Sequence, residues 1–270
     1  AGASASRTMP PARDNGRAVR AYQRTEGHMI HYDFKGRLQY IPGGALSVQM
    51  SAWPAAGANW WEPTTGSYTV VAAYQAKGAA DLASSLINLN SPGTNDLSVF
   101  TDAPDFDTET GWFFDEFNNR LASNASTSNK PATYIFRVKP ISSSGYRTII
   151  GGDDASGALS VDVANSTNYM RVLNQGVANI GTSTTALTAD ADSVGAVSYS
   201  GAGAYVFYVN GSAAGSGTNN QTLAAGKTLR IGFQDSATQL FFGYILAVAM
   251  YSTVLDATQI AEITTNMQAL

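Results

Sequence analysis

The sequence predicts an all-β protein of the sandwich or barrel type, with one short helix at its C-terminus. Composition is the first indication. Only 13 % of the 270 residues are charged and 26 are glycine, a profile that suits a protein rich in strands and turns. The second indication is a series of short runs that alternate between apolar and polar residues and end at Gly, Asn, Asp or Pro, with no helical pattern between them.

The expected strands follow one another at short intervals. They cover residues 67–75, 133–140, 146–152, 158–164, 169–175, 195–200, 204–211 and 228–234. Asn210-Gly211 supplies the positive φ of a tight hairpin turn. The helix is expected in "DATQIAEITTNM", where Asp256 is a suitable N-cap and Ile260 and Ile263 fall on one face.

The stretch "LFFGYILAVAMY", residues 240–251, contains no charged residue. Its twelve residues are fewer than the roughly 20 that a membrane-spanning helix needs. Odd and even positions are both apolar, which predicts a strand buried on both faces. Ala247 and Ala249 are small, so we expect another segment to pack closely on their face. That segment is either residues 32–66 of the same chain or another subunit.

The N-terminal segment differs in charge from the rest of the chain. Residues 1–37 hold seven basic and three acidic side chains, a net charge of +4, so the remainder carries −8. Residues 1–31 show no periodicity and should be disordered alone. We expect an arm that anchors the protein, held by a neighbouring subunit rather than by its own body. Its arginines are Arg7, Arg13, Arg17, Arg20 and Arg24. A solvated tail is the simpler alternative.

The C-terminal sequence also carries a family resemblance. "YVFYVNGSAAGS", followed by "LRIGFQDSATQLFFGYILAVAMYSTVLDATQIAEI", resembles the C-terminal half of concanavalin A-like, laminin-G-like jelly rolls. Upstream, "VVAAYQAKGAADLASSLINLNSPGTNDL" and "DAPDFDTETGWFFDEFNNRLAS" are similar to the opening of laminin-G-like modules of bacteriophage virion proteins. The likeness implies a concanavalin A-like jelly-roll β-sandwich over residues 67–270, preceded by an N-terminal arm and extension over residues 1–66.

The resemblance implies little about chemistry, because this sandwich hosts lectins, glycanases and adhesion modules. Its glycanases carry a strand of the outline Glu-x-Asp-x-x-Glu, which this sequence lacks, and the acid clusters near residues 102–109, 115–116 and 153–154 stand in turn-like contexts. We therefore expect no enzymatic activity. No metal or other cofactor is expected either, since the chain has no cysteine, and His28 and His31 lack a third ligand. A solvated acidic loop is preferred to a calcium site.

Sugar binding has a set of candidate residues. Lectins of this fold use Asp, Asn, Gly and an aromatic residue from loops. The candidates here are Trp60, Trp61, Asp153, Asp154, Asn174 and Asn179. The paired tryptophans have a simpler interpretation, which we favour: they pin their segment to the sandwich.

Two functional hypotheses follow. The first is a non-enzymatic virion structural protein, such as a phage capsid decoration, head-fibre or tail component, that is made in the host cytoplasm. Its partners would be other virion subunits, in a homo-oligomer, with a surface glycan as a further partner and no nucleic acid or membrane. The alternative is a carbohydrate-binding adhesin module that recognises a host surface.

Overall fold

The computed structural model divides the chain into two compact units, Ala1–Trp53 and Pro54–Leu270. The sequence predicts the boundary further along, between residues 66 and 67. In the first unit the backbone of five short strands is described. In the second the described residues are 59–126, 132–141, 147–153, 157–164, 167–174, 178–223, 226–234 and 239–270.

The first unit contains two small antiparallel sheets. One pairs β1 (Arg13–Asp14) with β2 (Arg17–Ala18), and the other joins β3 (Gln23–Thr25), β4 (His28–Tyr32) and β5 (Leu38–Tyr40). Of the predicted anchoring arginines, Arg13, Arg17 and Arg24 lie on these strands. Arg7 and Arg20 lie outside the described residues. The anchoring role stays a prediction.

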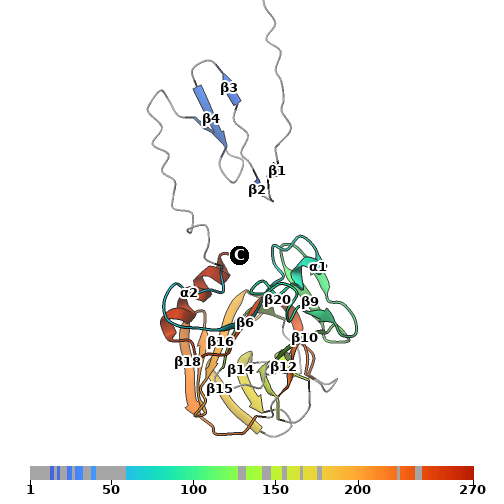
Figure 1. Ribbon diagram of the computed structural model, residues 1–270, viewed down its shortest axis with the longest axis vertical. Helices are drawn as coiled ribbons and strands as arrows, with labels where there is room; N and C mark the ends of the chain where they lie inside the picture. The colour runs from blue at the N-terminus through green and yellow to red at the C-terminus, as the bar shows by residue number, and fades with distance from the viewer. Residues whose placement is uncertain are drawn as a thin grey trace, which may run out of the picture. The chain divides into compact units, whose positions relative to one another are not determined.

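The second unit is a sandwich of two antiparallel sheets, as predicted (Figure 1). One sheet has seven strands, in the order β15-β14-β13-β12-β19-β10-β7. The other has eight, in the order β18-β17-β16-β11-β20-β9-β8, with β6 also paired to β20. The bounds of the first sheet are β7 Ser98–Val99, β10 Leu121–Ser126, β12 Arg147–Gly152, β13 Leu159–Val163, β14 Tyr169–Asn174, β15 Ala178–Ala186 and β19 Thr228–Ile231. Those of the second are β6 Val70–Gln75, β8 Asp105–Asp107, β9 Gly111–Asp115, β11 Ala132–Pro140, β16 Ser193–Tyr199, β17 Ala204–Val209, β18 Ser212–Thr218 and β20 Phe242–Tyr251.

Each of the eight expected strand runs overlaps a strand of the sandwich. The turn between β17 and β18 also forms as expected, with φ of 49° at Asn210 and 79° at Gly211. Among the strands of the sandwich, β7 to β10 and β15 were not predicted, whereas β18 is the second strand of the expected hairpin. The sequences of β15 and β18 are rich in Gly, Ala, Ser and Thr.

Small residues in β15 and β18 have a structural reason. A Cβ atom on Gly181 of β15 would lie 2.3 Å from the Tyr205 ring, and one on Gly217 of β18 would lie 2.4 Å from its hydroxyl oxygen. These two strands belong to different sheets. The ring of Tyr205 therefore fills the edge of the sandwich between them, where there is no room for side chains.

The main core lies between the two sheets. Alternate residues of the strands point into it, including Trp112, Phe136, Val161 and Phe207, all completely buried. Burial of such side chains away from water is the dominant favourable term in folding. No helix among the described residues is long and apolar enough to cross a membrane.

The strand β20 is buried on both faces, as its sequence predicts. Val248 and Met250 point into the core between the sheets, whereas Ala247 and Ala249 have no exposed surface and belong to a second core on the outer face of the eight-stranded sheet. The predicted alternation breaks at one place. The pairing with β11 shifts by one residue at Leu246, and this bulge places Ile245 in the core between the sheets.

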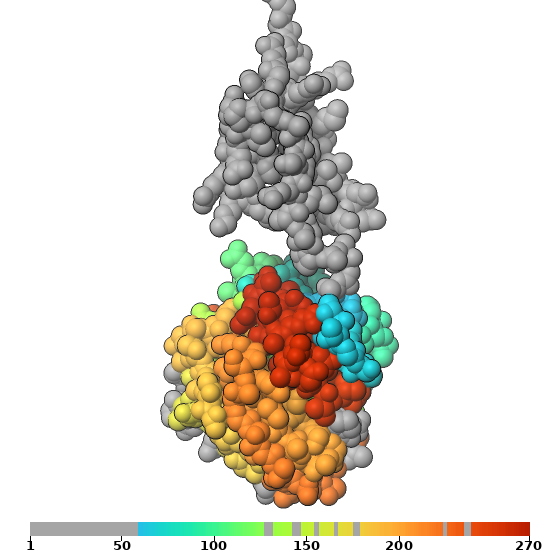
Figure 2. All heavy atoms as spheres, turned by 90° about the vertical axis from the view of Figure 1, so that its left-hand side faces the viewer, coloured from blue at the N-terminus to red at the C-terminus, as the bar shows by residue number. Residues whose placement is uncertain are grey.

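The second core is covered by α2 (Ala257–Gln268) and by the segment that contains Trp60 and Trp61. Figure 2 shows this segment lying beside the C-terminal helix. The Gln259 side chain donates a hydrogen bond of 2.8 Å to the carbonyl oxygen of Thr65 and so links the two. Within the described residues, the Ala247 face is thus covered by segments of the same chain. A role of this face in assembly stays a prediction.

The two helices begin with the same local arrangement. The carboxylate of Asp256 accepts a hydrogen bond of 2.9 Å from the backbone N–H of Gln259, and the Gln259 side chain accepts one of 3.0 Å from the backbone N–H of Asp256. This capping box satisfies N–H groups that the helix itself leaves unpaired, and it confirms the predicted N-cap. The short α1 (Leu82–Ser85) is capped in the same way by Asp81.

Candidate functional site

The two outer faces of the sandwich differ. That of the eight-stranded sheet is largely covered by α2 and the tryptophan segment. On the seven-stranded sheet, outward positions of the central strands carry polar and charged side chains. Arg230 stands between Leu229 and Ile231, which are both completely buried in the core between the sheets. Its side chain therefore points outward. The second face is the candidate functional surface.

An arrangement of two arginines and two phenylalanines, here called the Arg–Phe cluster, lies on this sheet. It consists of Phe100, Arg120, Arg230 and Phe233. The rings of Phe100 and Phe233 are stacked, with centroids 5.4 Å apart and an interplanar angle of 28°. The guanidinium carbon of Arg230 is 4.7 Å from the Phe100 centroid and 5.8 Å from that of Phe233, and that of Arg120 is 5.3 Å from Phe233. Arginines over aromatic faces are held by cation–π attraction.

The neighbouring strands β7, β10 and β19 position the cluster. Phe100 directly follows β7 and Arg120 directly precedes β10, and the backbone N–H of Phe100 donates to the carbonyl oxygen of Arg120 at 2.9 Å. Phe233 is completely buried, whereas 51 % of Phe100 is exposed. The cluster thus presents one aromatic ring to solvent on a fixed base.

A second polar group lies further along the same face. Thr148, Asp162, Arg171 and Thr182 are paired across β12, β13, β14 and β15. Asp162 is completely buried and accepts hydrogen bonds from the Thr148 hydroxyl at 3.0 Å and from Arg171 at 3.1 Å. Burial raises the pKa of the Asp162 carboxyl to about 6, although Arg171 acts in the opposite direction.

Trp60 and Trp61 are not available to a sugar. Only 7 % and 6 % of their surfaces are exposed, and the rings meet edge to face at 5.4 Å. The indole N–H of Trp60 donates to the Gln75 side chain at 3.0 Å. Neither ring offers a free face, so the pair holds its segment against the sandwich, which is the simpler of the two interpretations of the sequence.

The described polar sugar candidates, Asp153, Asn174 and Asn179, lie at the end of the seven-stranded sheet where β12 and β14 end. Asp153 accepts a hydrogen bond of 2.8 Å from the Thr228 hydroxyl. Asn174 is buried, and its amide donates to the carbonyl oxygen of Thr222 at 3.0 Å. Asn179 is exposed at the start of β15, and Asp154 lies outside the described residues. The buried Asn174 thus connects two loops.

The acidic segment before β9 differs partly from expectation. Asp105 and Asp107 lie on β8, a short strand at the edge of the eight-stranded sheet, rather than in a turn. The Asp107 carboxylate accepts hydrogen bonds from the backbone N–H groups of Glu109 and Thr110, at 2.9 and 3.0 Å, and they lower its pKa. No group of three His, Cys, Asp or Glu side chains suited to a metal ion occurs among the described residues.

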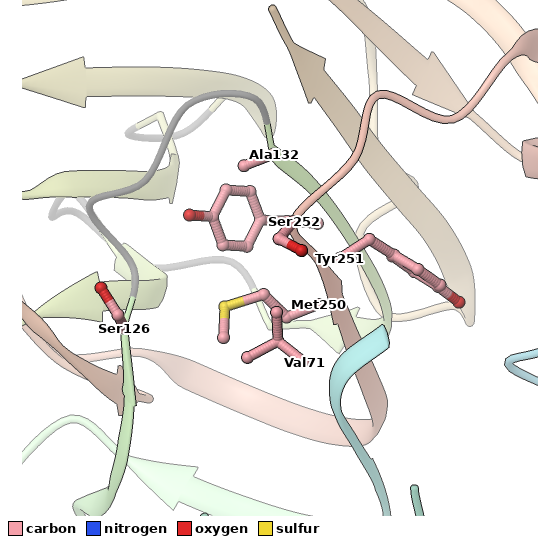
Figure 3. A pocket seen from close by; sticks show the side chains of 7 residues that line it. Val71, Ser126, Ala132, Met250, Tyr251 and Ser252 are labelled. Atoms are coloured by element: carbon pink, nitrogen blue, oxygen red, sulfur yellow. The ribbon is translucent and has the colours of Figure 1, made fainter. Parts of the chain in front are cut away.

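A small cavity opens between β10, β11 and β20 (Figure 3). Its volume is about 50 Å³, and its lining consists of Val71, Ser126, Ala132, Tyr134, Met250, Tyr251 and Ser252. Pockets for small molecules usually measure about 300–1,000 Å³. This cavity is therefore too small for a sugar.

The sequence interpretation did not single out any residue of the Arg–Phe cluster. One signal was present. Arg230 is the charged outward residue of "TLRI", a predicted strand with two apolar inward residues. Phe100 and Arg120 flank strands that were not predicted, so nothing in the sequence indicated that they would meet.

A comparison of the sequence with family models identifies the fold family. The model described as the concanavalin A-like lectin/glucanases superfamily matches residues 116–261, more than half of the chain. The chain belongs to this superfamily. The match to the superfamily includes Arg120, Arg230 and Phe233 but not Phe100. No curated protein sequence matches the chain.

Solved structures share the superfamily fold at low sequence identity. The receptor binding domain of botulinum neurotoxin D is 15 % identical with a TM-score of 0.55, over 73 % of this chain and 52 % of that one. Botulinum neurotoxin type C, whose cell entry depends on interaction with two ganglioside molecules, is 10 % identical with a TM-score of 0.57. This match covers 74 % of the present chain and 51 % of the toxin chain. Domain 4 of AbnA, an extracellular arabinanase from Geobacillus stearothermophilus solved with arabinotriose, is 15 % identical with a TM-score of 0.52, over 74 % and 100 %.

These matches differ in the share of the solved chain that they cover. The chain spans about half the length of the two toxin chains, but the whole of the arabinanase domain. At 10 to 15 % identity the likeness shows a shared fold. Function has to be argued from the side chains of this chain.

Proposed function

We propose that this protein is a non-enzymatic carbohydrate-binding module that recognises a surface glycan through the outer face of its seven-stranded sheet. The observation that carries the proposal is the half-exposed ring of Phe100, fixed on the buried ring of Phe233. Aromatic rings present a flat apolar surface to the C–H groups of a sugar, while arginine N–H groups donate to its oxygens. The Arg–Phe cluster provides both.

The fold neighbours support this choice. Three of the chains that share the fold are described with a carbohydrate: botulinum neurotoxin D with N-acetylneuraminic acid, type C with gangliosides, and the arabinanase domain with arabinotriose. The exposed ring of Phe100 also suits a glycan chain, which does not need a deep pocket. The tryptophan pair has no part in this proposal because both rings are buried.

The absence of catalysis is part of the proposal. Glycoside hydrolysis needs two carboxyl groups on either side of the bond that is cleaved. On the candidate face Asp162 is completely buried, and its described hydrogen-bond partners are Thr148 and Arg171. A buried carboxylate that is paired with a cation is poorly placed to reach a substrate. Measurable hydrolysis of an oligosaccharide by the intact chain would contradict this part of the proposal.

A glycan array probed with the intact chain tests the binding function. We expect a defined set of glycans to bind, and the free sugar to compete. Phe100→Ala should abolish this binding and leave the fold unchanged. Val254→Ala is a matched control, because Val254 is also exposed but lies in the loop between β20 and α2. No binding on the array, or equal binding by the Phe100→Ala variant, would contradict the proposal.

A structural role in a virion is the second candidate, and it is compatible with the first. It rests on the resemblance to phage modules and on the compact N-terminal unit, which carries Arg13, Arg17 and Arg24 on its strands. Under this candidate, residues 1–66 anchor the protein to sister subunits or to the particle. Light scattering should then show an oligomer for the intact chain and a monomer for a chain that lacks residues 1–53. The same number of chains per particle for the two proteins would contradict the candidate.

A further inference from the structure

The charge of the Arg–Phe cluster contrasts with that of the chain around it. Residues 38–270 carry nine basic and seventeen acidic side chains. Within the described residues the ion pairs are Arg137 with Asp192 and Arg171 with Asp162. Arg120 and Arg230 make no ion pair there, although carboxylates are common elsewhere on the protein. The cluster is therefore a positively charged spot on an acidic body.

Both arginines lie beside the same aromatic ring. Both guanidinium groups lie over the ring of Phe233, which is completely buried. Like charges near one ring repel each other, and the attraction of each cation to the ring opposes this repulsion. The Nε atoms of both arginines are buried and have no hydrogen-bond partner among the described residues. An anion would relieve the repulsion and accept hydrogen bonds from the guanidinium groups.

We infer that the Arg–Phe cluster binds an anionic sugar, with the carboxylate or sulfate group on Arg120 and Arg230 and the pyranose ring against Phe100. This inference rests on the proposed function and narrows its ligand class. The planar guanidinium group can donate two parallel N–H hydrogen bonds to one oxyanion. Phe100 is half exposed, Arg230 lies over its ring, and its backbone is hydrogen-bonded to that of Arg120, so we place one sugar residue against all three side chains.

A single-stranded nucleic acid is the other anionic ligand that pairs aromatic rings with arginines. Proteins that bind it use a basic groove along the backbone and a series of rings for successive bases. Here Phe100 is the exposed ring of the cluster, and Phe233 beneath it is completely buried. One ring with two arginines fits a single charged sugar better than a run of nucleotides.

Calorimetry on the intact chain tests the inference with three probes that share a lactose core: 3′-sialyllactose, 3′-sulfolactose and lactose. We expect at least one anionic probe to bind about tenfold or more tightly than lactose, a difference of about 1.4 kcal/mol. The stronger of the two identifies the anion. Arg230→Gln and Arg120→Gln should each remove this preference. Lys139→Gln is the matched control, because it removes one positive charge from the opposite sheet, where Lys139 lies over Tyr244.

Two further measurements test the inference even if a glutamine variant fails to fold. Arg230→Lys retains the charge but not the planar donors, so it should keep only part of the preference. Added salt should weaken the anionic probes and leave lactose unchanged. If the three probes bind with equal affinity and Phe100→Ala abolishes the binding of all three, the inference is overturned and the proposed function stands. Tighter binding of a dT20 oligonucleotide than of any glycan would overturn the inference in favour of nucleic acid, and a glycan array without binding would overturn the proposed function itself.

Discussion

The Arg171 guanidinium donates a hydrogen bond of 3.1 Å to the carboxylate of Asp162, which has no exposed surface. A buried carboxylate loses its hydration, and the attraction of one cation compensates for only part of the lost hydration free energy. The pKa of Asp162 therefore rises from 3.8 to about 6, even with Arg171 beside it. The pair connects β13 and β14 on the candidate face and makes the stability of the sandwich dependent on pH.

The sign of this dependence follows from the raised pKa. Protonated Asp162 favours the folded state, so its stabilisation is complete below pH 3.8 and is lost as the pH rises through about 6. Asp162→Asn cannot ionise. Between pH 3.5 and 7.5 we expect the wild type to lose on the order of 3 kcal/mol of unfolding free energy relative to this variant. Urea unfolding at a series of pH values measures the difference, and parallel curves for the two proteins would contradict the assignment.

The N-cap of α2 gives a second prediction. Asp256→Ala removes the acceptor for the backbone N–H of Gln259, so we expect a loss of about 1 kcal/mol in unfolding free energy. Asp256→Asn keeps an acceptor and should cost less. Thermal unfolding followed by circular dichroism measures both. Equal stability of the alanine variant and the wild type would show that the cap is dispensable.

The sequence predicted those parts of the fold that local patterns determine. Alternation located the long strands, Asn210-Gly211 located a hairpin turn, and Asp256 located the start of α2. Burial of Ala247 and Ala249 was also predictable, because a strand that is apolar on both faces must be covered on both. The strand β15 could not be found in this way. Its Gly181 is set by the ring of Tyr205, which lies on another strand.

The candidate site was less accessible to sequence reasoning. Aromatic residues, aspartates and asparagines were chosen there by type, and this selection included Trp60, Trp61 and Asn174, which are all buried. Burial depends on which segments pack together, and the pattern of a single segment does not contain that information. Phe100 and Phe233 lie far apart in the chain, and their stacking follows from the sheet order β19-β10-β7.

A pair of glycines tests the packing of the core. A Cβ atom on Gly195 would lie 2.4 Å from the ring of Phe136 and 2.7 Å from the sulfur of Met170, whereas one on Gly201 would meet nothing within 4 Å. Gly195→Ala should therefore cost about 1–3 kcal/mol of unfolding free energy, since overpacking displaces core side chains. Gly201→Ala should have little effect. Urea unfolding of both variants checks this, and equal stabilities would mean that the core yields more easily than its packing indicates.

The last prediction concerns residues 59–66, which pack as part of the sandwich, whereas the sequence analysis counted them with the N-terminal arm and extension. The Tyr251 hydroxyl donates a hydrogen bond of 2.7 Å to the carbonyl oxygen of Trp61, and both groups are buried. Tyr251→Phe leaves that carbonyl unpaired and should cost about 1–3 kcal/mol. Tyr244→Phe, on the same strand but partly exposed, should cost little.

Two shortened chains test the whole segment. A chain that begins at Pro54 should unfold like the intact sandwich. One that begins at Ser67 should lose several kcal/mol of unfolding free energy, because it lacks Trp60 and Trp61, which belong to the second core. Equal stability of the two shortened chains would show that this segment does not stabilise the sandwich.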